Sequence, residues 1–298
     1  MYTIMGASGH VGFAVVKELT AQNLPVRAVL HQREKAEALK KLGAEVVFAD
    51  TFELPSLLSA FRGSKAVFLI TPETGQNADL IADTKTMLNN YRQAIVACAV
   101  KKVVGLSSIG AHLGAGSGNL EMSHLLEHAF DGLEADQVFL RPAYYFSNWL
   151  MGAQQVKRTG LLYSFYPPNL VIPMVSPEDV ARIVADLLTR TEHGKKVYEM
   201  EGPAEYAPED VAQAMSDTLG RFVKVNPIPK QDWESVLKKI GFSHNAAENF
   251  IKMTECVVNG QARPEGKGIS LLKGTTSLEQ FIKSAFRSSI PVYTSHTP

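Results

Sequence analysis

The stretch Gly6-Ala7-Ser8-Gly9-His10-Val11-Gly12 decides the fold that the sequence predicts. It follows a short apolar run at 2–5, typical of a strand, and precedes apolar positions at helical spacing from Val11 to Leu19. Glycines at such a turn let the backbone approach a pyrophosphate, whose charge then meets the N–H groups of the helix N-terminus. The alternative is a tight turn that needs small residues only for packing. The position between a strand and a helix favours a dinucleotide-binding loop.

Beyond this loop, short apolar runs alternate with helical periodicity through about residue 110. We expect strands at 2–5, 26–30, 45–49, 66–70 and 103–107, separated by helices. The runs are almost continuous in Val, Ile, Phe and Leu, which suits strands that are buried on both faces. The pattern therefore predicts an α/β fold: a Rossmann-type, doubly wound parallel sheet with helices on both faces.

The regular alternation ends after Ser108, and the rest of the chain is mainly helical. Ser176-Pro177-Glu178-Asp179 has the N-cap, the first-turn proline and the acidic residues of a helix start. Further expected elements are a helix at 120–130, strands at 137–140 and 197–200, and helices at 208–219, 230–240 and 245–258.

The chain is expected to divide into a core and a smaller lobe. Residues 1–150 would form the cofactor-binding core, with 173–200 returning to it. Residues 151–172 and 201–298 would form the mainly helical C-terminal lobe. The substrate is then expected between core and lobe, beside the carboxyl ends of the strands.

The composition excludes several classes of protein. The 298 residues include 30 basic and 30 acidic side chains, and this zero net charge argues against nucleic acid or an anionic membrane as main partner. No run of about 18 apolar residues occurs, and the N-terminus lacks the features of a secretory signal. Cys98 and Cys256 lie far apart in apolar helical patterns, which indicates small buried residues rather than a disulfide. These features predict a cytoplasmic protein.

The spacing Gly-x-x-Gly-x-x-Gly differs from the Gly-x-Gly-x-x-Gly of many dehydrogenases. With this loop, the chain resembles the NmrA-like family of atypical short-chain dehydrogenases/reductases. The resemblance extends over nearly the whole chain, through Phe48-Ala49-Asp50, Leu69-Ile70-Thr71-Pro72, Gly105-Leu106-Ser107-Ser108, Leu140-Arg141-Pro142 up to Asn148, 175–188, and Thr275-Thr276-Ser277-Leu278-Glu279-Gln280-Phe281. The order and spacing of these segments carry the resemblance.

The resemblance implies a nicotinamide dinucleotide as cofactor. Asp50 and Thr51 would contact its adenine end, and Thr71 and Pro72 would lie beneath it. The segment after Arg141-Pro142 would pass the nicotinamide. The expected cofactor-binding residues are Gly6, Ala7, Ser8, Gly9, His10, Val11, Gly12, His31, Arg33, Lys35, Asp50, Thr51, Thr71, Pro72, Ser107, Tyr144 and Phe146.

The residues after the second expected strand bear on the choice between NAD(H) and NADP(H). NAD-binding folds carry Asp or Glu there to hold the ribose hydroxyls, whereas this chain has His31-Gln32-Arg33-Glu34-Lys35. The family usually has Arg where His31 stands, and a neutral His contributes little charge. Arg33 and Lys35 offer cations for a 2′-phosphate; the alternative is that both are solvated charges at a helix start. The sequence predicts NADP(H) in preference to NAD(H).

The residues expected near the nicotinamide depart from the usual short-chain dehydrogenase pattern, in which the Tyr of a Tyr-x-x-x-Lys helix supplies the proton. No Tyr in this chain has Lys four residues later. The family's serine position is kept by Ser107 or Ser108, and the candidate catalytic residues are Ser107 and His124, which stands where the family often has Lys or His. Two alternatives stay open: a hydride transfer that takes its proton from water, and binding of the dinucleotide without catalysis.

Aromatic residues follow Arg141-Pro142, where the family's segment lines the substrate cleft. Tyr145, Trp149 and Tyr166 are the candidate substrate contacts, because such rings stack on a flat acceptor. The alternative is that they form core between the sheet and the C-terminal helices. His124-Leu125-Leu126-Glu127-His128 matches the inverted zincin pattern, but it is short and lacks a third ligand, so we expect no metal.

These features predict an NADPH-dependent oxidoreductase that transfers hydride to a small, flat acceptor such as a quinone, or to a related carbonyl or azo compound. The acceptor class follows from the resemblance. The alternative is a non-catalytic redox sensor that distinguishes NADP from NADPH and regulates a partner, which the missing Tyr-x-x-x-Lys favours. A nucleotide-sugar epimerase would need the absent Tyr. The expected partner is a small molecule, with a homodimer or a regulated protein as further options.

Overall fold

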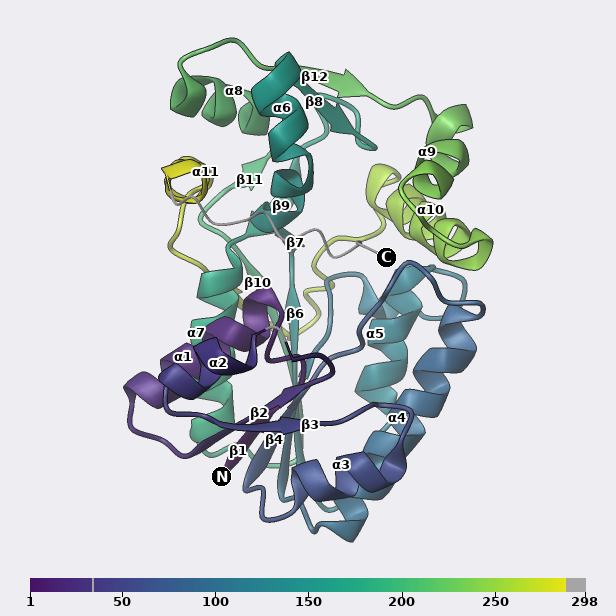
Figure 1. The fold of residues 1–298 in the computed structure, drawn as a ribbon. Coiled ribbons are helices and arrows are strands. Elements are labelled where there is room, and N and C mark those ends of the chain that lie inside the picture. Colours follow the sequence, from purple (N-terminus) through teal and green to yellow (C-terminus); the bar gives the residue numbers. More distant parts are fainter. Residues whose placement is uncertain (34, 288–298) are drawn as a thin grey trace.

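A parallel eight-stranded sheet forms the centre of the molecule (Figure 1). The computed structural model describes residues 1–33 and 35–287. The strand order is β13-β10-β6-β5-β4-β1-β2-β3. The strands are β1 (Tyr2–Ile4), β2 (Val26–Leu30), β3 (Glu45–Phe48), β4 (Ala66–Leu69), β5 (Lys102–Leu106), β6 (Asp136–Pro142), β10 (Lys195–Glu201) and β13 (Ser270–Lys273). This architecture confirms the predicted Rossmann-type fold.

Helices cover both faces of the sheet (Figure 1). One face carries α1 (His10–Ala21), α2 (Ala36–Lys41) and α7 (Pro177–Thr189), and the other carries α3 (Leu54–Phe61), α4 (Leu80–Ala97) and α5 (Asn119–His128). Successive strand residues point to opposite faces. In β4, Phe68 packs in the cluster under α1 and α7, whereas Val67 and Leu69 pack in the cluster under α3 and α4. Burial on both faces explains the continuous apolar runs of the sequence.

The lobe lies above the large sheet in Figure 1 and contains two small sheets. One has the order β11-β9-β7, and the other pairs β12 with β8. The strands are β7 (Tyr144–Tyr145), β8 (Leu161–Ser164), β9 (Ile172–Val175), β11 (Glu205–Tyr206) and β12 (Lys224–Pro227), and the helices are α6 (Ala153–Thr159), α8 (Pro208–Leu219), α9 (Trp233–Lys239), α10 (His244–Val258) and α11 (Leu278–Arg287). These short strands have no counterpart among the expected elements.

The last described strand crosses the expected division of the chain. β13 belongs to the range 201–298 that was assigned to the lobe, yet it pairs with β10 at the edge of the large sheet. Within 173–200, α7 packs against α1 and β10 pairs with β6, while β9 joins a small sheet of the lobe. Residues 288–298 of the assigned lobe lie outside the described residues. The division into two domains stays a prediction.

Two further features concern the whole described chain. No helix in residues 1–33 and 35–287 is long and apolar enough to cross a membrane. Cys98 and Cys256 are free and half-buried, rather than fully buried as the sequence pattern indicated. The thiol of Cys98 donates to the backbone oxygen of Leu58 at 3.4 Å, so this cysteine takes part in the packing of α4 against α3.

Asp179, in the first turn of α7, anchors the segment that leads into α11. Asp179 is only 2% exposed. Oδ2 accepts hydrogen bonds from the backbone N–H groups of Thr275 and Thr276, both at 2.8 Å, and Oδ1 accepts one from the Thr276 hydroxyl at 2.9 Å. Arg182 pairs with the same carboxylate. The sequence pattern placed this acid at a helix start, and the structure adds its second role as an anchor.

We expect Asp179→Ala to lower the free energy of unfolding by about 3 kcal/mol, because the N–H groups at 275–276 lose a buried charged acceptor. Urea denaturation measures the change. Asp186→Ala is a matched control on the same helix: its carboxylate pairs with Arg190 but is 54% exposed, so we expect a loss below about 1 kcal/mol. Equal effects of the two substitutions would contradict the anchoring role.

Candidate functional site

The glycine loop lies at the carboxyl end of β1 and leads directly into α1. Gly6 has φ of +62°, and the Gly9 N–H donates to its carbonyl oxygen at 2.9 Å. A Cβ at Gly12 would collide with that oxygen, and a Cβ at Gly6 would collide with Ile70 at the end of β4. Gly9, the N-cap of α1, has no side chain to occupy the first N–H groups of the helix. The loop therefore has the close backbone approach that a pyrophosphate needs.

Two titratable side chains bear on this loop: Lys35, from the start of α2, and His10, which belongs to the loop. Lys35 Nζ donates to the backbone oxygen of Ser8. Burial lowers the pKa of Lys35. Burial, followed by the charge of Lys35, lowers the pKa of His10, and Glu178 has the opposite, smaller effect. The sequence placed Lys35 beside a 2′-phosphate, whereas its contact in the structure is with the loop itself.

The carboxyl ends of β2 and β3 hold a second group of expected cofactor residues. The Arg33 guanidinium lies over the Phe48 ring, with 5.5 Å from Cζ to the ring centroid. His31 Nε2 is 3.7 Å from Asp50 Oδ2, and both side chains are largely exposed. The backbone oxygen of Thr51 accepts from the side chain of Asn90 in α4 at 3.0 Å. The sequence analysis quoted Phe48 only within a family motif and missed it as the platform for Arg33.

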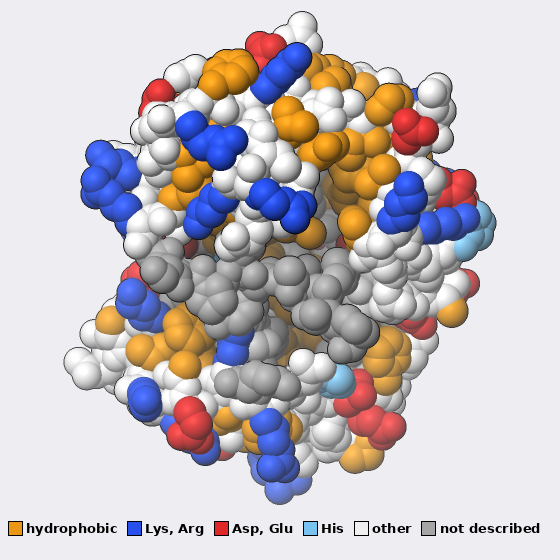
Figure 2. All heavy atoms as spheres, turned by 45° about the horizontal axis from the view of Figure 1, so that its top comes forward, with side chains coloured by type: hydrophobic (Ala, Val, Ile, Leu, Met, Phe, Trp, Pro, Cys, Tyr) orange, Lys and Arg blue, Asp and Glu red, His pale blue; other side chains and the backbone are white. Residues whose placement is uncertain are grey.

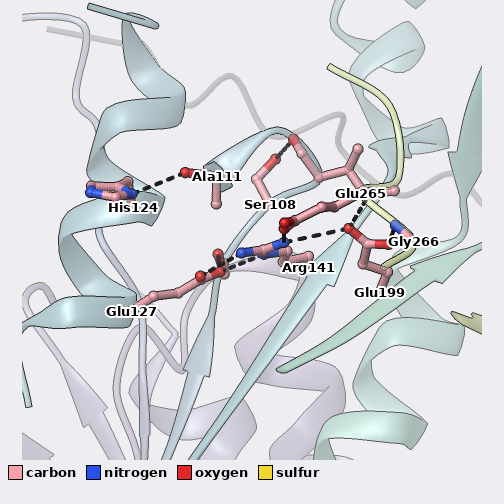
Figure 3. A network of polar contacts seen from close by, with 10 residues as sticks. Ser108, Ala111, His124, Glu127, Arg141, Glu199, Glu265 and Gly266 are labelled. Carbon is pink, nitrogen blue, oxygen red and sulfur yellow. Dashed lines mark hydrogen bonds and ion pairs between the residues drawn. The ribbon is translucent and has the colours of Figure 1, made fainter. Parts of the chain in front are cut away.

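Ser107 follows the last residue of β5 and contacts a buried charge network. Figure 3 shows the network around Arg141, with Glu127, Glu199 and Glu265. The Ser107 hydroxyl donates to Glu127 Oε1 at 2.5 Å, and Arg141 holds both oxygens of the same carboxylate at 2.8 Å. Arg141 also contacts Glu265 at 2.8 Å and Glu199 at 3.5 Å. The Ser107 hydroxyl is therefore directed to a structural ion pair of α5 and β6.

His124 lies on α5 one turn from the network (Figure 3). Its Nδ1 is 3.2 Å from the backbone oxygen of Ala111, and its ring centroid is 4.6 Å from that of His128. Glu127, the acid of the zincin-like pattern, is occupied by Arg141. Among residues 1–33 and 35–287, no three His, Cys, Asp or Glu side chains gather as a metal site would require.

The aromatic residues after Arg141-Pro142 mostly form the core of the lobe. Trp149 and Tyr166 are 5% and 4% exposed, and Phe146 is fully buried. Tyr144 packs edge-on against the first two rings, with centroids 5.6 and 5.4 Å away. This placement agrees with the alternative role of these rings, in which they pack as core between the sheet and the C-terminal helices. Tyr145 differs, because its buried hydroxyl has no hydrogen-bond partner among the described residues.

A second aromatic group lies where α9 and α10 meet the loop after β8, and its Phe165 belongs to an aromatic stretch of the sequence at 163–168 that was expected to cover the substrate cleft. We call Phe165, Trp233, Phe242 and Phe250 the α9–α10 aromatic cluster. Phe165 contacts Trp233 and Phe250 at centroid distances of 6.0 and 5.3 Å, and Phe242 contacts Phe250 at 5.7 Å. The three phenylalanines are half-buried. Figure 2 shows hydrophobic side chains gathered beside a hollow in the surface.

The segment after β4 carries Thr71 and Pro72 and then Glu73, which the sequence analysis missed. Asn119, the first residue of α5, donates from Nδ2 to Glu73 Oε2 at 2.8 Å. Burial raises the pKa of Glu73 to about 7. The quoted family motif ends one residue before Glu73, and only the fold brings Asn119 to it.

The loop after β4 is fixed to α10 by hydrogen bonds. The Ser243 N–H donates to the Gly75 oxygen at 2.7 Å, and the Leu80 N–H donates to Asn245 Oδ1 at 2.8 Å. At the start of α5, a Cβ on Gly118 would collide with the backbone oxygen of Asn249 in α10. These contacts bring the Glu73–Asn119 pair and the α9–α10 aromatic cluster to the same side of the molecule.

Comparison with known proteins agrees with this fold. Residues 2–287 match the model of the NmrA-like family. The chain is 26% identical to quinone oxidoreductase 2 of Escherichia coli (strain K12), over 96% of this chain and 99% of that protein. It is 25% identical to the NAD(P)H azoreductase of Xenophilus azovorans, over 83% and 84% of the two chains. The Citrobacter sp. triphenylmethane reductase complexed with NADP(H) shares the fold, with a TM-score of 0.78, 22% identity, and coverage of 96% of this chain and 100% of that chain. The protein described here therefore belongs to the NmrA-like family.

Proposed function

We propose that the chain is an NADPH-dependent reductase that transfers hydride to a small, flat acceptor such as a quinone. The observation that carries the proposal is the glycine loop, in which Gly6 and Gly12 leave no room for a Cβ and the start of α1 has no side-chain cap. Such a loop suits the pyrophosphate of a dinucleotide. The names of the relatives, an azoreductase and a quinone oxidoreductase, support the reaction class.

The cofactor would lie along the carboxyl edge of the sheet. Backbone N–H groups of residues 6–12 would bind the pyrophosphate, Asp50 and Thr51 would lie at the adenine end, and Thr71 and Pro72 would lie beneath the cofactor, beyond β4. When bound, the reduced nicotinamide supplies the hydride. The residues of this chain hold and orient the reactants.

Preference for NADP(H) is the finer part of the proposal. Arg33 is exposed at the carboxyl end of β2, and the Phe48 ring supports its guanidinium. A guanidinium in this position suits a 2′-phosphate. The position where NAD-binding folds have an acid is occupied by His31, which instead faces Asp50. Lys35 is turned to Ser8, so Arg33 carries the preference.

The acceptor is proposed to stack against the α9–α10 aromatic cluster. Phe165, Phe242 and Phe250 expose part of their rings, whereas Trp149 and Tyr166 are buried in the lobe core and have little surface to offer a substrate. Flat, conjugated acceptors are matched by such rings through offset or edge-on contacts. The cluster adjoins the loop after β4, over which the nicotinamide half of the cofactor would extend.

The redox-sensor alternative rests on the absent Tyr-x-x-x-Lys alone. It needs a regulated protein partner, and no feature of the described residues identifies one. The azoreductase and the quinone oxidoreductase, of which this chain covers 84% and 99%, have redox activities in their names, which supports catalysis over sensing.

We expect Arg33→Ser to raise the Kd for NADPH by about tenfold or more, because a charge-assisted hydrogen bond contributes roughly 1.5–3 kcal/mol. The Kd for NADH should change much less, since NADH has no 2′-phosphate. Titration calorimetry measures both constants. Phe48→Ala should show part of the effect, and Arg158→Ser, an exposed arginine of α6, should show none. Equal losses for NADH and NADPH would remove Arg33 from the 2′-phosphate site.

The purified protein should oxidise NADPH when a quinone or an azo dye is present and remain inactive without an acceptor, as nicotinamide absorbance reports. No turnover with any acceptor of the panel would refute the reductase. Phe250→Leu should raise the acceptor KM several-fold, because ring contacts contribute about 0.5–1.5 kcal/mol, and leave the Kd for NADPH unchanged. Phe222→Leu, at a position 79% exposed beyond α8, is the matched control. An unchanged KM in Phe250→Leu would exclude the aromatic acceptor site.

A further inference from the structure

A pair of side chains, Glu73 from the loop after β4 and Asn119 from the start of α5, leaves two oxygen atoms buried without a partner among the described residues. Asn119 Nδ2 donates to Glu73 Oε2 at 2.8 Å. The other oxygens of the two side chains, Glu73 Oε1 and Asn119 Oδ1, are both buried without a hydrogen-bond partner among the described residues. Glu73 Oε1 therefore has no donor within the described part of the chain to stabilise a negative charge in this buried place. The pair therefore favours a carboxyl group that carries a proton.

The surroundings of Glu73 agree with a neutral carboxyl. Burial is the one cause that raises its pKa to about 7. Most titratable groups on the neighbouring elements are engaged elsewhere: Asp79 caps α4, Asp83 accepts from Asn77, Glu121 accepts from Gly116, His124 contacts Ala111, His244 pairs with Glu234, and Lys252 pairs with Glu248. His112 has a buried Nδ1 without a hydrogen-bond partner among the described residues, and its charge lowers the pKa of Glu265 rather than that of Glu73. No charge in the described part of the chain thus holds Glu73 ionised.

The position of Glu73 relates it to the proposed reaction. It follows Thr71 and Pro72, three residues beyond Ile70, and Ile70 packs against Gly6 of the glycine loop. Asn119 begins α5, which packs against α10 of the aromatic cluster. The pair thus belongs to the loop after β4 and to α5, the two segments that connect the proposed cofactor edge with α10 of the aromatic cluster.

We propose that Glu73, held by Asn119, is the proton donor that completes reduction of the acceptor; this rests on the proposed function. Glu73 would give its proton to one oxygen of the quinone, which becomes negative when the other oxygen takes the hydride that a bound reduced nicotinamide would supply. The Glu73 O–H bond breaks, a new O–H bond forms on the acceptor, and Glu73 is left as a carboxylate that water reprotonates. The hydride brings two electrons and one proton and Glu73 brings the second proton, so a quinone leaves as a hydroquinone.

The assignment also accounts for the missing Tyr-x-x-x-Lys. The two candidates from the sequence are engaged in other contacts, since Ser107 donates to Glu127 and His124 Nδ1 lies against Ala111. Glu73 retains an oxygen without a partner. Asn119 acts as a positioning residue, because its amide fixes the second oxygen of the carboxyl.

Glu73→Gln keeps the shape and the contact with Asn119 but removes the acidic proton. We expect kcat with a quinone to fall about 100-fold, the lower end of general acid contributions, with the Kd for NADPH unchanged. Wild-type kcat should fall as the pH rises through about 7, and this dependence should vanish in Glu73→Gln. Glu73→Asp should retain the pH dependence and part of the rate. A Glu73→Gln enzyme with wild-type kcat and pH profile would overturn the proposal.

A second measurement needs neither cofactor nor acceptor. Folding raises the Glu73 pKa from 4.5 to about 7, so its stabilising contribution is full below pH 4.5 and is lost as the pH rises to about 7. Over that window, wild-type protein should lose stability to denaturant relative to Glu73→Gln. Glu134→Gln, at an exposed glutamate, should follow the wild-type profile. Parallel profiles of wild type and Glu73→Gln would show a carboxylate already ionised and overturn the proton donor.

The two measurements separate the proposal from the function on which it rests. A wild-type protein that turns over no acceptor refutes the reductase and, with it, the proton donor, even where the stability profiles differ. Turnover that is insensitive to Glu73→Gln removes the proton donor and leaves the reductase intact. Turnover that falls in Glu73→Gln, together with the expected difference in stability, supports both.

Discussion

The contact between Gly12 and the carbonyl oxygen of Gly6 is the constraint on which the rest of the structure depends. A Cβ at Gly12 would collide with the backbone of Gly6, so the end of β1 and the first turn of α1 meet at backbone distance, and the Ile70 side chain packs against Gly6. This close approach fixes the angle at which α1 leaves the sheet and leaves the helix N-terminus open to an anion. The cofactor edge, and hence the position of Glu73 beyond β4, follows from it.

A second constraint joins the far half of the sheet to the C-terminal segment. Arg141 is buried on β6 and binds Glu127 of α5, Glu199 of β10 and Glu265 of the loop before β13. A buried guanidinium and its carboxylates are costly to separate, so the three segments stay together. The backbone N–H of Glu265 also donates to Glu199 at 2.8 Å, which closes this loop over the sheet.

The apolar runs and the glycine loop predicted the central strands, because strands buried on both faces need continuous apolar sequence. β13 was missed because three of its four residues are exposed, so it carries no buried run. In the site, Arg33 was predicted from its charge and place after β2, but its support by Phe48 and the turn of Lys35 toward Ser8 depend on tertiary packing. The sequence around Trp149 allowed two roles, stacking on a substrate or packing in the core. Its exposure of only 5% is a property of the fold and favours packing.

Glu73 was missed for a related reason: its chemistry arises from burial and from Asn119, 46 residues further along the chain. The contacts of α5 explain why the proposed proton donor, Glu73, lies in the loop after β4 and not on α5. Glu127 of this helix binds both Ser107 and Arg141. These contacts give the buried side of α5 a structural role. A proton donor near the proposed acceptor site then has to come from a neighbouring element, and the loop after β4 is the neighbour that hydrogen bonds to α5 and α10 hold in place. The ion pair that stabilises the sheet thus occupies Ser107, and the proposed proton donation falls to the loop after β4.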